Sequence, residues 1–368
     1  MSRIITNDDL YQKLKSHQNI LLIDVRDPKD FEMWNIYQSI NIPLSKLIRK
    51  AKSLPKDREI VTICAKGNDS SRAVNLLTNF GLNAVSLKDG LKAWNNVYDI
   101  VNVAPAKQSV LKVFQVKRLG KGCLSYIIIL PDKKTTIIID PTFNSTIYAD
   151  FLKANKLKLK AIIDTHLHAD HVSGGKNLSK KFHALYLLPD KSKVSYKFTS
   201  LTRGLSKIMQ KTHFKILETP GHTPESVSII LDNRFVFTGD TLFLDSVGRS
   251  DLTEDKSTNA RLLYESVINT LFGLDEDIFV LPSHSSQSLV PGPSMAATMR
   301  YVRRFNEIAQ NKNVEAFIKL QENIIPPPAN FTKIKQLNMT GKPRSLKEVE
   351  IMEFGHNSCS ITLKTGKV

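Results

Sequence analysis

The segment THLHADH, residues 165–171, contains three histidines and an aspartate within six positions, directly after the apolar run AIID. Imidazole and carboxylate groups on a loop that follows a strand can converge on one cation, because a loop need not follow the period of a helix or strand. A lone histidine is more often structural, but this density is typical of a metal site. We therefore predict metal-site roles for His166, His168, Asp170 and His171.

Three later residues extend this set of metal ligands. His222 lies in the Pro-Gly turn of TPGHTPES, Asp240 follows the apolar run FVFTG, and His284 ends the run VLPSH. Each is weak evidence alone, since a histidine or aspartate after a strand is common. Together with the first motif they supply enough ligands for two metal ions. A dinuclear zinc hydrolase, with a bridging hydroxide as nucleophile, is therefore one chemistry that the sequence allows.

A second kind of chemistry is indicated by CAKGNDS, residues 64–70, which follows the apolar run EIVTI and precedes a helical pattern. A loop between a strand and a helix start forms an anion cradle, because backbone N–H groups and the helix dipole favour negative charge. Cys64 in such a loop is expected to react as a thiolate. The alternative is a buried structural cysteine. We interpret Cys64 as a reactive thiol that carries a persulfide or accepts sulfur from thiosulfate.

The predicted secondary structure divides the chain into two domains. Residues 1–104 combine short apolar runs such as LLIDV and NAVSL with the helical pattern RAVNLLTNF, which predicts a parallel α/β sheet. Proline and small polar residues in NVAPAKQS predict a linker, placed at residues 105–112. Residues 113–345 begin with the hairpin pattern CLSYIIIL–TTIIID and form the second predicted domain. Residues 346–368 are left as an unassigned tail.

The first 104 residues resemble single-domain rhodaneses. IDVRDPKDF supplies the usual aspartate and arginine, Asp24 and Arg26, for which we expect structural roles, and NIPL and GLKAW fall where that family has equivalents. The sequence departs from the family in WNIYQS, which replaces a common Gly-His-Ile segment. It also has Asp69 where many rhodaneses have arginine. Lys66 is the candidate to supply the missing positive charge and bind substrate, and the sulfur donor stays open.

The region from about residue 113 to residue 293 resembles the metallo-β-lactamase superfamily, whose fold is an αββα sandwich with metals at one edge. The chain is thus predicted to be a rhodanese-like parallel α/β sheet followed by that sandwich. GKGCLSY, TPGHTPESVS, GDTLFLDSVGRSDL and PPPANFTKIKQLN are similar to persulfide dioxygenases, especially those associated with rhodanese domains. LPSHSSQS lacks the glycine-rich stretch that commonly follows the last histidine in related sequences.

This resemblance implies one Fe(II) per chain, held by His166, His222 and Asp240. Two histidines and a carboxylate leave coordination positions open for a persulfide and O2, whereas zinc has no accessible redox change. Four further residues would orient these ligands and pass protons, or hold a second metal: His168, Asp170, His171 and His284. Arg249, in VGRSDL, either binds an anionic thiol carrier or forms a salt bridge under the site. Cys359, in the tail, is expected to have no chemical role.

The sequence therefore predicts an oxidoreductase that converts the sulfane sulfur of a small persulfide to sulfite, with sulfurtransferase activity at Cys64. The leading alternative is a thioester hydrolase of the glyoxalase II kind with two zinc ions. A metallo-β-lactamase-fold nuclease would use the net charge of +17, but the lysines are spread over both halves and predict a solvated surface that attracts small anions. The expected partners are a low-molecular-weight thiol persulfide, O2, and thiosulfate or sulfite, with no nucleic acid and no membrane.

The composition indicates where in the cell this chemistry would take place. Three cysteines are too few for a disulfide framework, and the first residues lack the apolar core of a signal peptide, so we expect a cytoplasmic protein. The longest apolar stretches are far shorter than the roughly 20 residues that span a bilayer. The identity of the thiol carrier, the direction of sulfur flow and the presence of a homo-oligomer are left open.

Overall fold

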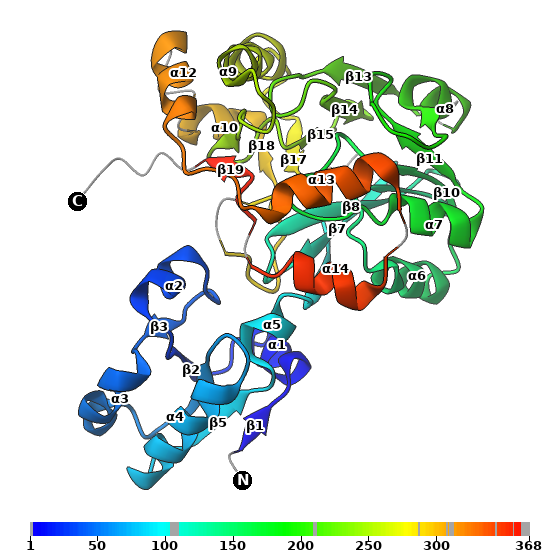
Figure 1. The fold of residues 1–368 in the computed structure, drawn as a ribbon. Coiled ribbons are helices and arrows are strands. Elements are labelled where there is room, and N and C mark those ends of the chain that lie inside the picture. Colours follow the sequence, from blue (N-terminus) through cyan, green and yellow to red (C-terminus); the bar gives the residue numbers. More distant parts are fainter. Residues whose placement is uncertain are drawn as a thin grey trace.

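The structure is a computed structural model that describes residues 3–103, 110–208, 212–285, 288–306, 308, 313–342, 344–355 and 357–361. An N-terminal α/β unit, blue to cyan in Figure 1, leads into a larger unit that contains two sheets. This order of architectures confirms the predicted fold class. No helix within the described residues is long and apolar enough to cross a membrane.

The N-terminal unit is built on a five-stranded sheet in the order β1-β5-β4-β2-β3, with all of its strand pairs parallel. Its central strands are the predicted apolar runs, which are buried because helices cover both faces of such a sheet. The strands are β1 (Ile4–Ile5), β2 (Ile20–Asp24), β3 (Ile40–Asn41), β4 (Glu59–Ile63) and β5 (Ala84–Leu87). The helices are α1 (Asn7–Lys15), α2 (Pro28–Met33), α3 (Leu44–Lys50), α4 (Asn68–Asn79) and α5 (Gly90–Trp94).

The second unit packs two sheets face to face. The first sheet has the order β12-β11-β10-β9-β8-β7-β6 and the second β13-β14-β15-β17-β18. Its strands are β6 (Tyr98–Asn102), β7 (Lys112–Arg118), β8 (Cys123–Ile129), β9 (Thr135–Ile139), β10 (Lys158–Ile163), β11 (Leu185–Leu188), β12 (Thr199–Ser200), β13 (Phe214–Glu218), β14 (Val227–Leu231), β15 (Phe235–Gly239), β17 (Phe279–Pro282) and β18 (Ala297–Thr298). The predicted hairpin is the antiparallel pair β8–β9.

Helices cover the outer faces of the two sheets and complete the αββα layering. α6 (Ser145–Ala154) and α7 (Gly175–Phe182) share a buried cluster with the first sheet, and α9 (Lys256–Glu265) and α10 (Met299–Phe305) share one with the second. Apolar side chains of both sheets, such as Tyr126 and Phe237, form the core between them. The remaining helices are α8 (Leu201–Ile208), α12 (Val314–Glu322), α13 (Asn330–Thr340) and α14 (Leu346–Met352).

The junction between the units lies earlier than the predicted boundary at residue 104. β6 pairs antiparallel with β7 along its whole length and forms the edge of the seven-stranded sheet. The sequence YDIVN resembles a last strand of the first domain, but its hydrogen-bonding partner is the strand that follows it along the chain. Most of the predicted linker, residues 105–109, lies outside the described residues, and Lys112 already begins β7.

The described part of the unassigned tail belongs to the second unit. It contains α14 and β19 (Ser360–Ile361), which pairs antiparallel with β16 (Val247–Gly248). Glu353, between them, is buried, forms an ion pair with Arg118 and accepts a hydrogen bond from the N–H of Val172. The tail therefore packs directly behind the THLHADH loop. Residues 362–368 lie outside the described part of the chain.

Candidate metal centre

The THLHADH loop follows β10 and is held in place by the end of the neighbouring strand. Asp140, directly after β9, accepts hydrogen bonds from the N–H of Thr165 at 2.7 Å and from its hydroxyl at 2.8 Å. Ser283, which follows β17 in the other sheet, also hydrogen-bonds to Asp140. Because β9 and β10 are parallel, their carboxyl ends lie at the same edge. One buried carboxylate thus fixes the start of the loop between the two sheets.

Three side chains from separate loops form what we call the first ligand group: His166, His222 and Asp240. The Nε2 atoms of His166 and His222 lie 3.6 and 3.4 Å from Asp240 Oδ2. All three side chains are about 1% exposed, and none of these three atoms has a hydrogen-bond partner. Buried polar atoms without partners are costly, so their convergence fits a bound cation. The residues predicted to hold iron are therefore brought together.

Hydrogen bonds on the far side of each ring direct the free nitrogens toward Asp240. His222 Nδ1 lies 2.8 Å from the carbonyl oxygen of Arg249, which can only accept, so Nδ1 carries the proton. Thr165 gives its hydroxyl proton to Asp140, so its oxygen accepts from His166 Nδ1 at 2.9 Å. Burial lowers the pKa of His222 to about 4. Despite burial, the carboxylate of Asp240 raises the pKa of His166. In its neutral form each ring carries its proton on Nδ1, which leaves Nε2 free to bind a metal.

Glycines make the close approach around Asp240 possible. A side chain at Gly248 would place its Cβ 1.9 Å from the carbonyl oxygen of Asp240 and 3.0 Å from His222 Nδ1. Gly239 has φ of +53°, a left-handed conformation that suits glycine, and its Cβ would lie 2.6 Å from Thr165 Oγ1. A side chain at Gly239 or Gly248 would therefore clash with the residues that position Asp240.

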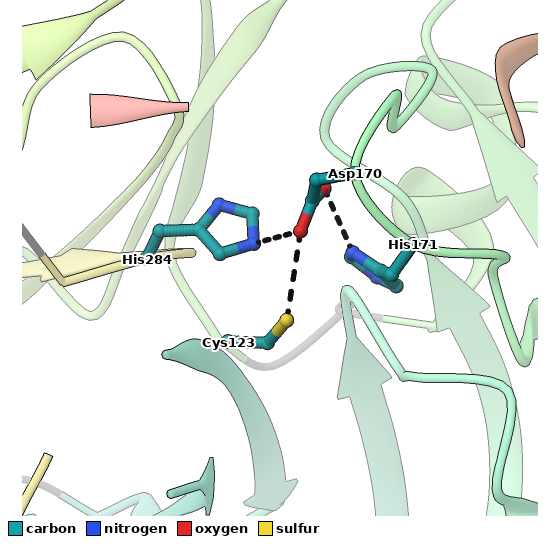
Figure 2. A group of neighbouring side chains, drawn as sticks. All are labelled: Cys123, Asp170, His171 and His284. Atoms are coloured by element: carbon teal, nitrogen blue, oxygen red, sulfur yellow. Dashed lines mark hydrogen bonds and ion pairs between the residues drawn. The ribbon is translucent and has the colours of Figure 1, made fainter. Parts of the chain in front are cut away.

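A second ligand group lies beside the first and consists of Cys123, Asp170, His171 and His284 (Figure 2). Asp170 lies at its centre, with His284 Nε2 at 2.8 Å, His171 Nδ1 at 3.0 Å and Cys123 Sγ at 3.6 Å. His284 also lies 2.6 Å from Asp240 Oδ1 through Nδ1, which joins the two groups. Burial alone would lower the pKa of His284, but the carboxylates of Asp170 and Asp240 raise it well above its usual value.

His168 completes the cluster of predicted ligands. Its Nε2 lies 3.3 Å from Asp140 Oδ1, its ring centroid is 4.2 Å from those of both His166 and His171, and both of its nitrogens lack hydrogen-bond partners. Burial, followed by the neighbouring His171 and His166, lowers its pKa to about 3. All seven predicted metal-site residues are thus assembled in one buried centre, where His168 offers a further nitrogen donor.

Sequence reasoning missed three residues of this centre: Cys123, Asp140 and Cys359. Cys123 begins β8, and Asp140 follows a parallel strand, so the rule that strand ends share one edge could have found Asp140. Cys359 Sγ lies within 4.8 Å of ligand atoms of Asp240 and His284, although we expected no chemical role for it. No sequence pattern links it to the motifs, because the β16–β19 pairing that positions it joins residues far apart in the chain.

The structure decides between the two roles considered for Arg249. Its guanidinium donates to both oxygens of Asp251, at 2.6 and 2.7 Å, and to the carbonyl oxygens of Ser358 and Ile325. The side chain is 3% exposed. The prediction that Arg249 binds a thiol carrier is therefore wrong. Arg249 forms the salt bridge under the site and ties the tail to the loop that follows Asp240.

Cys64 lies in the predicted anion cradle, which we call the thiol cradle and define as residues 64–70 between β4 and α4. Its Sγ accepts a hydrogen bond from the N–H of Gly67 at 3.1 Å and lies 3.3 Å from Ser70 Oγ. Gly67 has φ of +95°, and a Cβ on Gly90 would lie 2.2 Å from the carbonyl oxygen of Cys64. The loop is therefore shaped by backbone contacts that only glycine permits, with the sulfur facing the N–H of Gly67.

The charged residues of the thiol cradle lie at its surface. Asp69 and Lys66 are exposed, and Asp69 forms an ion pair with Arg72 one turn later in α4. Asp24, by contrast, is buried and pairs with the partly buried Arg26, which also donates to the carbonyl oxygen of Trp34. Their structural role agrees with our expectation. The substrate-binding role of Lys66 stays a prediction.

Comparison with known proteins agrees with this architecture. Residues 6–97 match the model of the rhodanese-like domain, and residues 119–284 match that of the metallo-beta-lactamase superfamily. The hydroxyacylglutathione hydrolase of Francisella tularensis subsp. novicida (strain U112) is 34% identical over 180 residues, which cover 46% of this chain and 67% of that protein. The chain belongs to the metallo-beta-lactamase superfamily. It combines that fold with an N-terminal rhodanese-like domain.

Solved structures show the same superfamily fold. A metallo-beta-lactamase from Staphylococcus aureus subsp. aureus COL superimposes with a TM-score of 0.56 at 25% identity, over 64% of this chain and 74% of that one. ETHE1 from Myxococcus xanthus superimposes with a TM-score of 0.52 at 24% identity, over 62% of this chain and 97% of that one. The second likeness shows the fold alone. The buried ligand groups are consistent with a metal site of this superfamily.

Proposed function

We propose that this superfamily member is an iron-dependent persulfide dioxygenase with sulfurtransferase activity at Cys64. The overall reaction takes one persulfide R–S–SH, one O2 and one water to R–SH and sulfite with two protons. The sulfane sulfur is oxidised and O2 is reduced, so no further electron donor is needed. The expected cofactor is one Fe(II) per chain, and the thiol carrier is a small molecule.

The observation that carries the proposal is the first ligand group in a chain that also has a thiol cradle. The three free atoms of that group, two imidazole nitrogens and one carboxylate oxygen, are the donor set of a facial triad. When bound there, Fe(II) would supply open positions at which a persulfide and O2 can meet. The rhodanese-like domain handles the same sulfane sulfur as a cysteine persulfide, so both halves share one chemical intermediate.

The surrounding residues orient and shield the first ligand group. His284 donates to Asp240 Oδ1, which leaves Oδ2 to face His166 and His222. Asp170 in turn holds His284 and His171 in fixed positions, while His171 Nε2 stays unpaired and can hold or release a proton. Burial of all these groups excludes bulk water and strengthens each electrostatic contact.

Sulfur transfer at Cys64 needs no metal. Sulfite attacks the outer sulfur of the Cys64 persulfide, the S–S bond breaks, and thiosulfate leaves while Cys64 keeps the electron pair as thiolate. The N–H of Gly67 stabilises that thiolate, and the helix dipole of α4 favours negative charge at the same place. The reverse reaction loads Cys64 from thiosulfate, so the direction follows the supply of sulfite and thiosulfate.

The test is anaerobic purification, metal analysis and an oxygen electrode. With about one iron per chain, addition of glutathione persulfide should consume one O2 per sulfite formed. Two zinc ions per chain without oxygen uptake would rule the dioxygenase out. The assay should be repeated with coenzyme A persulfide, because glutathione and coenzyme A are both candidate thiol carriers.

A thioester hydrolase is the second candidate. The second ligand group offers four donors within 4.8 Å of one another, which is enough for a second cation, and the hydroxyacylglutathione hydrolase of Francisella shares a third of its matched residues with this chain. Against it, both ring nitrogens of His284 are paired with carboxylates, Nε2 with Asp170 and Nδ1 with Asp240. Hydrolysis of S-lactoylglutathione by the zinc-loaded chain would favour this candidate.

A further inference from the structure

A cavity of about 360 Å3 lies where the two domains meet, and we call it the interdomain cavity. The rhodanese-like domain contributes Arg26, Met33, Trp34, Ala65 and the solvent-exposed Asp30, and the second domain contributes residues around α13 and the tail. The Trp34 ring meets the Phe354 ring edge-on, with centroids 5.3 Å apart, so the domains are in contact at its rim. Its volume lies within the range of small-molecule sites.

The walls of the interdomain cavity adjoin both reactive centres. Ala65 directly follows Cys64 in the thiol cradle. On the opposite side, Phe331 belongs to a buried cluster with Ala169 of the metal loop and with Cys359. A molecule in this cavity therefore contacts residues that neighbour each centre, Ala65 on one side and Phe331 on the other.

A buried positive charge lines the same cavity. Lys121 is 1% exposed, and its ammonium donates one hydrogen bond, to the carbonyl oxygen of Glu353 at 3.0 Å. Within the described residues no carboxylate lies at ion-pair distance from it, although a buried ammonium is costly unless it is paired. Arg26 adds its Nη1, which makes no hydrogen bond to any residue that the structure describes. Among the described residues Lys121 thus has no counter-ion, and the cavity next to it has room for one.

We propose that the interdomain cavity binds an anionic sulfur compound, with Lys121 and Arg26 holding its negative group and Trp34, Phe331 and Phe354 packing on its apolar part. Its anionic group is either the carboxylate or phosphate of a small thiol carrier, or a free sulfur oxyanion. The site serves both centres, because a ligand held there lies between Cys64 and the metal loop. This proposal rests on the proposed function only in its assumption that the ligand is a sulfur compound.

The test measures binding by calorimetry in the full-length chain carrying Cys64→Ser, which prevents covalent transfer. The probes are S-methylglutathione, coenzyme A and thiosulfate, each titrated alone, and thiosulfate is then titrated against whichever thiol compound binds. We expect at least one to bind, and Lys121→Met to weaken that binding about tenfold or more, which is the loss of one charge-assisted contact. Lys176→Met is the matched control, because Lys176 lines a separate cavity of about 310 Å3, and it should leave the affinity unchanged.

A second pair of variants guards against misfolding of Lys121→Met. Met33 is 71% exposed at the rim, so Met33→Trp should fill the cavity mouth and weaken binding, whereas Ile48→Trp, on exposed α3 outside the cavity, should not. Tryptophan fluorescence locates the ligand: its change on binding should disappear in Trp34→Phe. Binding that is absent for all probes, or unchanged in both Lys121→Met and Met33→Trp, would overturn the proposal.

The probes also separate the two sources of the anion and the two proposals. Thiosulfate that competes with a bound thiol shows one site for both, and thiosulfate binding alone assigns the site to free oxyanions. Because no turnover is measured, anion binding at Lys121 in a chain without oxygen uptake would sink the dioxygenase and keep the cavity site. Oxygen uptake by the parent chain, together with an affinity for the probes that Lys121→Met leaves unchanged, would keep the dioxygenase and sink the cavity site.

Discussion

The thiol cradle and the metal centre are two reactive sites built on opposite principles. In the cradle the Cys64 sulfur already has a backbone N–H partner, and the loop is shaped by glycines at Gly67 and Gly90. In the metal centre, six buried ligand atoms of His166, His168, His171, His222 and Asp240 lack hydrogen-bond partners. The cradle is therefore complete without a cofactor, whereas the centre is complete only with a cation.

This difference explains why one chain can hold both sites. The cradle uses neutral backbone donors, which favour a thiolate without fixing any metal. The metal centre concentrates three carboxylates, Asp140, Asp170 and Asp240, among buried imidazoles. Burying these negative charges is costly unless a positive charge, such as a bound cation, compensates them. Substitutions that affect one site should therefore leave the other intact, and this separation can be tested.

The largest effect is expected from Asp240→Asn. Loss of the carboxylate removes the anionic donor of the first ligand group, so bound metal should fall close to zero and oxygen uptake should be lost. Thiosulfate-to-cyanide sulfur transfer at Cys64 should stay within about twofold of the parent. The two sites share no residues, and substitutions at sites without shared partners act independently. The measurements are metal analysis, an oxygen electrode and a transfer assay on the same preparation. Loss of transfer in a folded variant would show that the two sites are not separate.

Cys64→Ser should do the opposite. Sulfur transfer should be abolished because a serine hydroxyl forms no persulfide, while oxygen uptake with a small persulfide should remain largely intact. Ser70→Ala is the matched control, since Ser70 Oγ lies 3.3 Å from the Cys64 sulfur but carries no sulfur itself, and it should retain measurable transfer. If oxygen uptake also disappears in folded Cys64→Ser, Cys64 supplies the substrate and the division of labour is wrong.

Metal removal should destabilise the second domain more than the first. A cation bound at a concentration a thousandfold above its dissociation constant adds about 4 kcal/mol to the free energy of unfolding. For a domain of this size that corresponds to a melting temperature higher by about 8–16 °C. Scanning calorimetry with and without a chelator, under anaerobic conditions, measures the shift. A chelator that leaves the whole unfolding curve unchanged would contradict the view that the centre requires a cation.

The same contrast separates what sequence could predict from what it could not. The two architectures, the cradle and all seven metal-site residues follow local patterns, because each lies in a short motif at a strand end. β6 was placed in the wrong unit, since strand pairing with β7 is not visible in YDIVN. Cys359 was missed because tertiary pairing of β19 with β16 brings it to the site. Arg249 could be resolved only by seeing Asp251 beside it.

A smaller effect is expected from the residues that orient the ligands. Thr165→Val removes the oxygen that accepts from His166 Nδ1 while keeping the side-chain volume, and it should weaken metal binding by about 10–100-fold. Thr165→Ser keeps the hydroxyl and is the control. Competition with a fluorescent chelator gives the affinities. Equal metal affinity in the valine and serine variants would mean that the Thr165 hydroxyl does not set the tautomer of His166.

The smallest effect concerns the charge at the mouth of the thiol cradle. Asp69 is exposed and pairs with Arg72, so its carboxylate opposes the approach of thiosulfate only through a screened interaction. Asp69→Arg should raise the kcat/KM for thiosulfate by up to about fivefold, the scale of an exposed ion pair, mainly through a lower KM. The gain should shrink as salt is added. Asp57→Arg, on an exposed turn of the same domain outside the cradle, controls for net charge. An equal gain in both variants would assign the effect to overall charge, and would leave Lys66 as the residue to test next in the cradle.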